Sequence, residues 1–463
     1  MSTSITVVGA GHVGSVTAAC LASAGHEVTC VDANPERVEA MRRGRSPVAE
    51  PGLAELLAQV LSAGRLRATA DIAGAVAASR ITMIAVGTPL VGGGMDLSAL
   101  ANVCDAIGTG LRQSRGYHVV AVRSTVVPGT TEALVRERIL QASGRPEETV
   151  GFCMNPEFLR EGSAVQDATH PDRIVIGQSD ARAGDTLAAV YAPFECPIIR
   201  TTLRNAELIK CASNALLATL ISFSNELAGI CERLPNTDVE EVLRVLHLDR
   251  RWSPVLEGRR ISPEILSYLR AGCGFGGSCL PKDLQALETF ARAQGIAPRL
   301  LEAVMAVNRQ RPLQLVKLLE GALSSLEGAV VAVLGLAFKP GTDDVRESPA
   351  LAVIEALIRA GASVNAYDPV AGPQARPHLD GRVRVCQTAD EALAEADAAV
   401  LVTAWPEFAA LDWPAMCRRM RQPIVVDGRS ALRSVRWPAG VTYLPIGQAP
   451  SMAVSDAEAV ARS

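Results

Sequence analysis

The strongest constraint on the fold is a unit that occurs twice: an apolar strand, a glycine turn, a helix, and a second strand that ends at an aspartate. The first copy begins "ITVVGAGHVG" and ends at Asp32, and the second begins "VVAVLGLAFKPG" and ends at Asp368. Gly361 and Asp368 repeat the spacing of Gly25 and Asp32, and the second copy carries an insertion, "FKPGTDDVRE", in its first loop. Such a unit is the first crossover of a parallel sheet, so two sheets are predicted.

Further apolar runs alternate with amphipathic helices after each copy, which favours open parallel sheets. They are "ITMIAV", "HVVAV" and "TVGFCMNP" after the first copy, and "DAAVLVTA" and "PIVVDG" after the second. Between the copies lies a helical region without a strand pattern, including a long apolar helix from Asn205 to Leu234. The prediction is an α/β fold with two Rossmann-like parallel-sheet domains joined by a long central helix region. The expected divisions are 1–204 for the first Rossmann domain, 205–325 for a helical connector and dimerisation region, 326–448 for the second Rossmann-like domain, and 449–463 for a flexible tail.

Composition narrows the class of protein. The 45 basic residues are spread along a chain of net charge -4, which argues against a nucleic-acid partner. The N-terminus has no signal-peptide pattern, and the richest apolar helix carries Asn214, Asn225 and Glu226, so no membrane partner is expected. The 11 cysteines form no C-x-x-C pair and no Cys/His group, so no metal site is expected and most thiols should be buried and reduced. A cytoplasmic enzyme fits best.

The first glycine turn has the pattern of a dinucleotide site. Gly9 allows the tight turn, Gly11 lets backbone N–H groups approach a pyrophosphate, and Gly14 permits close helix packing. Asp32 ends the next strand, where a carboxylate accepts both ribose hydroxyls and repels a 2′-phosphate. The expected cofactor is NAD.

A second glycine-rich stretch, "GCGFGGSCLPKD", places Cys279 at the start of a helix. A helix N-terminus stabilises a thiolate, and Lys282 one turn on would help. A thiolate can hold an aldehyde as a thiohemiacetal, which a second NAD oxidises to a thioester that water hydrolyses to an acid. From this stretch alone, a buried structural cysteine beside a flexible loop remains an equal alternative.

Five motifs taken together resemble the nucleotide-sugar 6-dehydrogenase family, which includes UDP-glucose and GDP-mannose dehydrogenases. In chain order they are "RSTVVPGTT", "NPEFLREG", "NAELIKCASNALLATLISFSNE", "GFGGSCLPKD" and "GLAFKPGTDDVRESPA". The resemblance covers nearly the whole chain, and this order is the family's order. The resemblance implies a four-electron oxidation of a primary alcohol to a uronate, with UDP-glucose as the first choice of substrate. GDP-mannose, TDP-glucose and UDP-N-acetylhexosamine are alternatives, as are a two-electron alcohol dehydrogenase and an NAD-binding sensor with a redox thiol.

The resemblance also implies catalytic roles. These residues are Cys279, Lys210, Asn214 and Glu157, with Thr125 and Asp283 holding a water near the reacting centre. Cys279 would be the nucleophile, Lys210 and Asn214 would donate to the developing oxyanion, and Glu157 would handle water in thioester hydrolysis.

From the residues alone, several of these positions have simpler interpretations. Glu207, Lys210 and Asn214 would form an ordinary solvated helix edge. Asp283 could be a charge at a helix start, and Glu161 could be an ion-pair partner of Arg160.

The resemblance implies two sets of binding residues. The cofactor set is Gly9, Gly11, His12, Val13, Gly14, Asp32, Arg37, Thr88, Thr125, Glu161, Lys282 and Arg346. The substrate set is Phe158, Leu159, Arg160, Glu161, Lys210, Asn214, Arg260, Tyr268, Gly276, Phe338, Lys339 and Arg429. The second glycine turn lacks G-x-G-x-x-G, so the second domain is expected to bind the sugar nucleotide rather than NAD.

Three departures from the family pattern affect details. Gly87 stands where the family often has proline before Thr88. The segment "EGRRISPEILSYLRAG" is longer than usual, which leaves open whether Arg259 or Arg260 reaches across a dimer interface. "STVVPG" and "SCLPKD" resemble the GDP-mannose branch, whereas "GCGFGG" resembles the UDP-glucose branch. A homodimer or higher homo-oligomer is expected.

Overall fold

The computed structural model describes residues 2–449, which belong to two compact units. Unit 1 holds Met1–Asn214 and Gln285–Ala297, and unit 2 holds Ala215–Leu284 and Pro298–Ser463. Two helices, α9 (Leu203–Cys231) and α12 (Leu280–Ala293), therefore contribute to both units. The division of the chain at residues 204, 325 and 448 stays a prediction, and the predicted tail lies almost wholly outside the described residues.

Unit 1 is built on one sheet with the strand order β10-β9-β8-β7-β4-β1-β2-β3. Its strands are β1 (Ser4–Val8), β2 (Glu27–Val31), β3 (Leu66–Thr69), β4 (Ile81–Ile84), β7 (His118–Val122), β8 (Val150–Met154), β9 (Ile174–Gln178) and β10 (Ile198–Thr202). From β3 to β8 this is the doubly wound order of dinucleotide-binding sheets. The sequence predicted a sheet that is parallel throughout, and the structure corrects this at one place: β9 runs antiparallel to β8.

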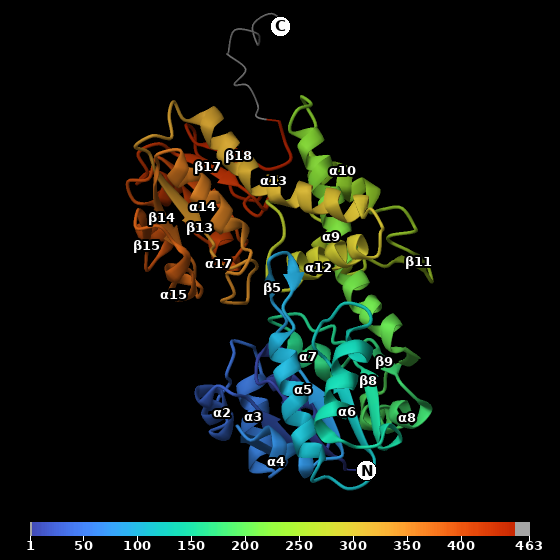
Figure 1. Cartoon of the computed structure of the whole chain (residues 1–463). Coiled ribbons are helices and arrows are strands. Elements are labelled where there is room, and N and C mark those ends of the chain that lie inside the picture. The colour runs from blue at the N-terminus through green and yellow to red at the C-terminus, as the bar shows by residue number, and fades with distance from the viewer. Residues whose placement is uncertain (1, 450–463) are drawn as a thin grey trace, which may run out of the picture. The chain divides into compact units, whose positions relative to one another are not determined.

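Helices cover both faces of this sheet, which is why β4 and β7 are wholly buried and almost entirely apolar. Their two polar residues, Thr82 and His118, hydrogen-bond to each other at 2.9 Å. The helices are α1 (His12–Ser23), α2 (Pro35–Arg42), α3 (Leu53–Ser62), α4 (Ile72–Ala77), α5 (Ser98–Leu111), α6 (Glu137–Ser143), α7 (Ala164–Thr169) and α8 (Ala181–Val190), with a π-helix η1 (Thr131–Arg136) and 3-10 turns η2 (Glu147–Thr149) and η3 (Ala192–Phe194). Helices α5 and α6 pack side by side on one face (Figure 1). A small hairpin, β5 (Leu90–Val91) and β6 (Gly94–Met95), follows β4.

Unit 2 repeats the doubly wound order in an all-parallel sheet, β15-β14-β13-β16-β17-β18 (Figure 1). Its strands are β13 (Val330–Leu334), β14 (Ser363–Tyr367), β15 (Val383–Val385), β16 (Ala398–Leu401), β17 (Ile424–Asp427) and β18 (Thr442–Pro445). The helices are α10 (Val239–Leu246), α11 (Ile265–Tyr268), α13 (Arg299–Ala322), α14 (Pro349–Arg359), α15 (Gly372–Ala375), α16 (Ala389–Leu393), α17 (Pro406–Ala409) and α18 (Trp413–Cys417), with the 3-10 turn η4 (Arg376–His378). The two sheets confirm the predicted fold class.

The central region is helical, with one correction. A short antiparallel hairpin, β11 (Val255–Leu256) with β12 (Arg259–Arg260), lies where no strand was predicted. Helix α9 also has the length and mean hydropathy, 1.3, of a helix that could cross a membrane, although 39% of its apolar window is buried inside the fold. Length and hydropathy alone therefore do not exclude a membrane-spanning helix here, although the sequence analysis excluded one from the polar residues.

Candidate active site

The glycine turn of unit 1 has the geometry that a dinucleotide requires. Gly9 has φ 107° and lies so close to Ala85 that a Cβ would come within 2.5 Å of its carbonyl oxygen. A Cβ at Gly14 would lie 1.7 Å from the Gly9 carbonyl oxygen, so α1 can approach the strand only with glycine there. Nothing lies within 4 Å of a Cβ at Gly11, which leaves open space at the start of α1. The residues present thus fit a pyrophosphate at this helix terminus.

Asp32 follows β2 and holds this turn in shape. Its Oδ2 accepts a hydrogen bond from the Ala10 N–H at 2.6 Å, and its Oδ1 accepts from the Asn34 N–H at 2.8 Å. Each carboxylate oxygen can accept a further hydrogen bond, so capacity remains for a ribose diol. The Arg37 guanidinium lies 3.6 Å from Oδ2.

Asp368 is the counterpart of Asp32 in unit 2, and donors of unit 2 occupy the hydrogen-bonding capacity of its carboxylate. Its Oδ2 accepts from the N–H groups of Leu336 and Ala337 and from the Trp405 indole, at 2.7 to 3.0 Å. Its Oδ1 accepts from the N–H groups of Val370 and Ala371. Five donors fill a buried carboxylate, so the repeated aspartate is a structural group in the second copy.

Glu157 and Lys210 form a buried ion pair in unit 1. The Lys210 Nζ lies 2.8 Å from Glu157 Oε1, and the two side chains are 5% and 6% exposed. The same ammonium lies 5.7 Å from the centre of the Phe158 ring, whose face also carries the Arg173 guanidinium at 4.1 Å. The solvated-edge interpretation of this helix face is wrong for Lys210, and also for Glu207, which is fully buried.

The charge on Glu157 is set by two opposed effects. Burial would raise the pKa of its carboxyl, but the Lys210 ammonium and the Leu159 N–H hold that pKa below its ordinary value. The Leu159 N–H donates to Oε2 at 2.7 Å. Glu157 is therefore an anion at neutral pH, and its neighbour Lys210 carries the balancing charge.

The loop after β7 brings the predicted Thr88 and Thr125 together. The Thr88 hydroxyl donates to the Thr125 carbonyl at 2.7 Å. On the other side, the Glu207 carboxylate accepts from the N–H groups of Gly129 and Thr131 at 2.5 and 2.7 Å, which ties this loop to α9. Asn214 lies half-buried one turn after Lys210 on the same helix.

In unit 2, Cys279 stands immediately before α12, with its carbonyl accepting the Asp283 N–H at 2.9 Å. Its side chain is exposed, whereas the other cysteines are buried apart from the half-buried Cys196. The alternative of a buried structural cysteine is therefore wrong. Lys282 does not stand free beside the thiol, because its Nζ lies 2.6 Å from the buried Asp283 carboxylate.

The loop before Cys279 is held by close backbone contacts within unit 2. A Cβ at Gly276 would lie 2.2 Å from the Glu347 carbonyl oxygen, and one at Gly277 would lie 2.8 Å from the Phe338 ring. The Asn308 side chain on α13 hydrogen-bonds to both backbone groups of Phe275. It accepts from the Phe275 N–H at 2.8 Å and donates to the Phe275 carbonyl at 3.0 Å. These contacts explain why glycine occupies the loop.

The inserted loop and β17 bring three predicted substrate residues near this cysteine loop. Phe338 touches it, the Lys339 Nζ lies 5.6 Å from the Phe338 ring centre, and a Cβ at Gly272 would lie 2.9 Å from Arg429 Nη1. Arg429 is oriented by its Nε, which donates to the Val402 carbonyl at 2.8 Å. The two cationic side chains suit a diphosphate.

Other predicted residues have partners that sequence did not suggest. The Arg160 guanidinium donates two hydrogen bonds to the Asp167 carboxylate, and Arg346 donates two to the Asp344 carboxylate. Arg260 donates to the Leu248 and Ser253 carbonyls at 2.6 and 3.0 Å. Tyr268 ends α11 with 36% of its surface exposed. Within residues 2–449, no three His, Cys, Asp or Glu side chains gather as a metal site would require.

Sequence reasoning missed the buried polar groups that shape the site. They are Glu50, Arg123, Asn155, Tyr191 and Glu207, together with the half-buried Asn308. Arg123, for example, donates from Nη1 to Asn155 Oδ1 and to the Tyr191 hydroxyl, at 2.6 and 2.8 Å. Asn155 and Glu207 lie inside the quoted motifs, so their membership of those motifs was the available signal. Their partners are distant in sequence and could not be read from spacing.

Comparisons with known proteins cover the whole arrangement. Residues 3–195 match the NAD binding domain of the UDP-glucose/GDP-mannose dehydrogenase family, residues 204–310 match its central domain, and residues 332–434 match its UDP binding domain. The chain is 43% identical to a UDP-glucose 6-dehydrogenase of Pseudomonas aeruginosa, over 96% of this chain and 97% of that protein. It is 37% identical to a GDP-mannose 6-dehydrogenase of Azotobacter vinelandii, over 89% and 94%.

Solved structures agree with these matches. A UDP-glucose dehydrogenase from Pyrobaculum islandicum superposes with a TM-score of 0.88 at 40% identity, covering 97% of this chain and 98% of that one. The match of residues 3–195 to an NAD binding domain confirms the predicted cofactor.

Proposed function

The chain belongs to the UDP-glucose/GDP-mannose dehydrogenase family, and from this premise we propose that it oxidises UDP-glucose to UDP-glucuronate. It is an NAD-dependent oxidoreductase, and the full reaction consumes two NAD and one water for each sugar. The observation that carries the choice of substrate is the relative similarity. Identity to the Pseudomonas UDP-glucose enzyme is 43% over 96% of the chain, against 37% over 89% for the Azotobacter GDP-mannose enzyme.

In the first oxidation, the C6 hydroxyl loses its proton and the C6 carbon loses a hydride. A bound water takes the proton, and the Lys210 ammonium and the Asn214 amide donate to the oxygen as it gains charge. A buried ammonium is effective here because water is excluded around it, and Glu157 compensates its charge. NAD, when bound, supplies the acceptor for the hydride in each of the two oxidations.

Cys279 then holds the aldehyde. Its thiolate attacks the carbonyl carbon, an S–C bond forms, and the carbonyl oxygen becomes the hydroxyl of a thiohemiacetal. Transfer of the remaining C6 hydride to the second NAD and of the hydroxyl proton to water leaves a thioester. The exposed position of Cys279 at the start of a 14-residue helix supports this role, because a helix N-terminus stabilises the thiolate.

Hydrolysis completes the turnover. Water adds to the thioester, the C–S bond breaks, the Cys279 thiolate is restored and the uronate leaves. We assign Glu157 to receive the proton of this water, with Thr125 and Asp283 positioning water. The ionised state of Glu157 supports its role as a base, since only the anion can accept a proton.

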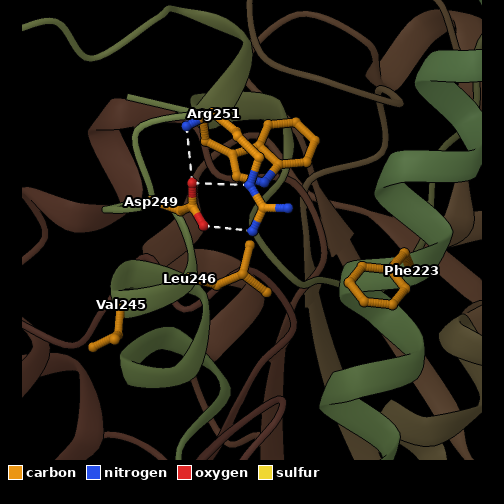
Figure 2. Close-up of a pocket in the computed structure, with 6 residues that line it drawn as sticks. Phe223, Val245, Leu246, Asp249 and Arg251 are labelled. Atoms are coloured by element: carbon orange, nitrogen blue, oxygen red, sulfur yellow. Dashed lines mark hydrogen bonds and ion pairs between the residues drawn. The ribbon is translucent and has the colours of Figure 1, made fainter. Parts of the chain in front are cut away.

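The same proposal includes a homodimer that uses the exposed face of α9. Leu216, Phe223 and Ile230 recur every seven residues on this helix and are 63%, 52% and 52% exposed. Val245 of α10 adds a further exposed apolar group, 54% exposed, around a hollow that Phe223 lines together with the Asp249 and Arg251 pair (Figure 2). A heptad-spaced apolar stripe suits a second copy of the same helix. We place the enzyme in the cytoplasm and retain the division of the chain at residues 204, 325 and 448.

A panel of nucleotide-sugars, scored by the NADH formed per sugar, tests the substrate and the electron count. UDP-glucose should give two NADH and the highest kcat/KM among UDP-glucose, GDP-mannose, TDP-glucose and UDP-N-acetylglucosamine. One NADH per sugar would indicate a two-electron alcohol dehydrogenase. No NADH with any member of the panel would favour the NAD-binding sensor.

A further inference from the structure

Glu50 is a buried carboxylate that none of the catalytic steps uses. It lies in the loop before α3, and its side chain is fully buried. Oε1 accepts from the Ala164 N–H at 2.7 Å, and Oε2 accepts from the Gly162 N–H at 2.8 Å. Burial would raise the pKa of Glu50, but His12 and these N–H groups hold that pKa below its ordinary value. Glu50 is thus an anion held by His12 and by two N–H groups that lie 112 and 114 positions away in the chain.

The oxygen that accepts from Gly162 also touches the dinucleotide turn. His12 Nε2 lies 2.9 Å from Glu50 Oε2. His12 is the first residue of α1 and follows Gly11, whose surroundings are open. One oxygen atom therefore joins the phosphate-binding turn to the segment around Gly162.

The segment attached to Glu50 is the one assigned to the sugar. Residues 157–161 carry the catalytic Glu157 and the backbone predicted to contact substrate, and Gly162 and Ala164 follow directly. Two further contacts hold this segment. The Leu159 N–H donates to the Glu157 carboxylate, and the Arg160 guanidinium donates to the Asp167 carboxylate at 2.7 Å. Glu50 alone among these contacts reaches the glycine turn of α1.

We propose that Glu50 is a positioning residue that couples dinucleotide binding at His12 to sugar-nucleotide binding at residues 157–161. A buried carboxylate that loses one partner bears an uncompensated charge, so its partners hold their positions together. Ordering one side of Glu50 therefore lowers the cost of ordering the other. The inference rests on the proposed function, in which the dinucleotide must be exchanged while the sugar stays on Cys279.

The coupling is measured as a ratio of dissociation constants. Calorimetry gives the Kd of UDP-glucose with and without saturating NADH, which cannot accept a hydride, and the Kd of NADH with and without UDP-glucose. In the wild type the two ratios should be equal by linkage and fall within about 5 to 150. Glu50→Gln and His12→Phe should each bring the ratio close to one, and combining them should change it no further.

Two features keep this test decisive. His12→Phe leaves the hydrogen bonds from Gly162 and Ala164 to Glu50 in place, so it should fold even if Glu50→Gln does not. Glu55→Gln and His170→Gln, at exposed positions, are the matched controls and should keep the wild-type ratio. A wild-type ratio of one, or an unchanged ratio in folded His12→Phe, would overturn the inference. An enzyme that makes two NADH per UDP-glucose yet shows no coupling would overturn this inference alone, whereas failure of the whole substrate panel would overturn the function.

Discussion

The Lys210 ammonium lies 2.8 Å from the Glu157 carboxylate, and both side chains are buried. The pair joins the residue assigned to the oxyanion and the residue assigned to water in one electrostatic unit. Neither can be removed without changing the charge state of the other, because each compensates a charge that burial would otherwise disfavour. Mutational effects at either position therefore contain a folding component and a catalytic component, which a double variant can separate.

Lys210→Ala should lower kcat by about 10² to 10³, with little change in the Kd of UDP-glucose, because its donation strengthens in the transition state. It should also lower the free energy of unfolding by about 3 to 5 kcal/mol, since Glu157 is left buried and unpaired. Steady-state kinetics, calorimetry and denaturant unfolding measure these three quantities. Lys210→Met with Glu157→Gln should recover much of the stability and none of the activity. Lys317→Ala, at an exposed position, is the control, and an unchanged kcat in Lys210→Ala would remove Lys210 from the mechanism.

The lowered pKa of Glu157 gives its ion pair a defined pH dependence. Stability from a depressed carboxyl pKa is fully present above the unfolded value, near 4.3, and is lost as pH falls through the folded value. The difference in unfolding free energy between wild type and Glu157→Gln should therefore be largest at neutral pH and shrink in acid. Denaturant unfolding at several pH values measures it. A difference that stays constant down to the acid transition would show that Glu157 is not held as an anion.

Asp32 should set the preference for NAD over NADP. Asp32→Asn can keep an acceptor for the Ala10 N–H, but it removes the charge that repels a 2′-phosphate and leaves Arg37 able to receive one. The ratio of kcat/KM for NAD to that for NADP should fall by roughly tenfold or more, which corresponds to about 1.4 kcal/mol. Asp172→Asn, at an exposed site, is the control. Comparable kcat/KM values with both cofactors in the wild type would contradict the role of Asp32.

The apolar stripe of α9 should hold two copies together. Phe223→Asp places a charge in the middle of the stripe and should convert the dimer to a monomer, as measured by light scattering or sedimentation. Ile199→Asp, which alters an apolar residue of similar exposure on the edge strand β10, should leave the dimer intact. A wild-type protein that sediments as a monomer at assay concentrations would contradict the proposed assembly.

Sequence periodicity could predict both sheets, because buried parallel strands are mostly apolar and the crossover helices are amphipathic. It could also place Cys279 before a helix and Gly9 in a turn, since those features are local. It could not predict that β9 runs antiparallel to β8, because strand direction depends on packing beyond the strand itself. Nor could it show that Asp368 is saturated, or that Glu50 reaches Gly162, because such contacts join residues that only the finished fold brings together.

Cys279→Ser tests the covalent step that distinguishes a four-electron oxidation. Serine keeps the size of the side chain and a hydroxyl, but it is far less ionised near neutral pH, and its ester hydrolyses more slowly than a thioester. The second half of the reaction should therefore be blocked more severely than the first. Binding of NAD and of UDP-glucose should remain close to wild type, since the exchange changes the side-chain volume little and Cys279 belongs to neither set of binding residues.

The readouts are the NADH formed per sugar in steady state, intact-protein mass spectrometry for a trapped ester, and the yield of UDP-glucuronate. We expect little acid and either an accumulated covalent ester or a stalled enzyme. Cys196→Ser, which alters the half-buried cysteine, should turn over normally and excludes a general effect of thiol removal. If Cys279→Ser instead produced two NADH per sugar within a few-fold of the wild-type rate, the covalent mechanism would be wrong. The exposed thiol at the start of α12 would then have no chemical role, because nothing in the oxidation would depend on its thiolate.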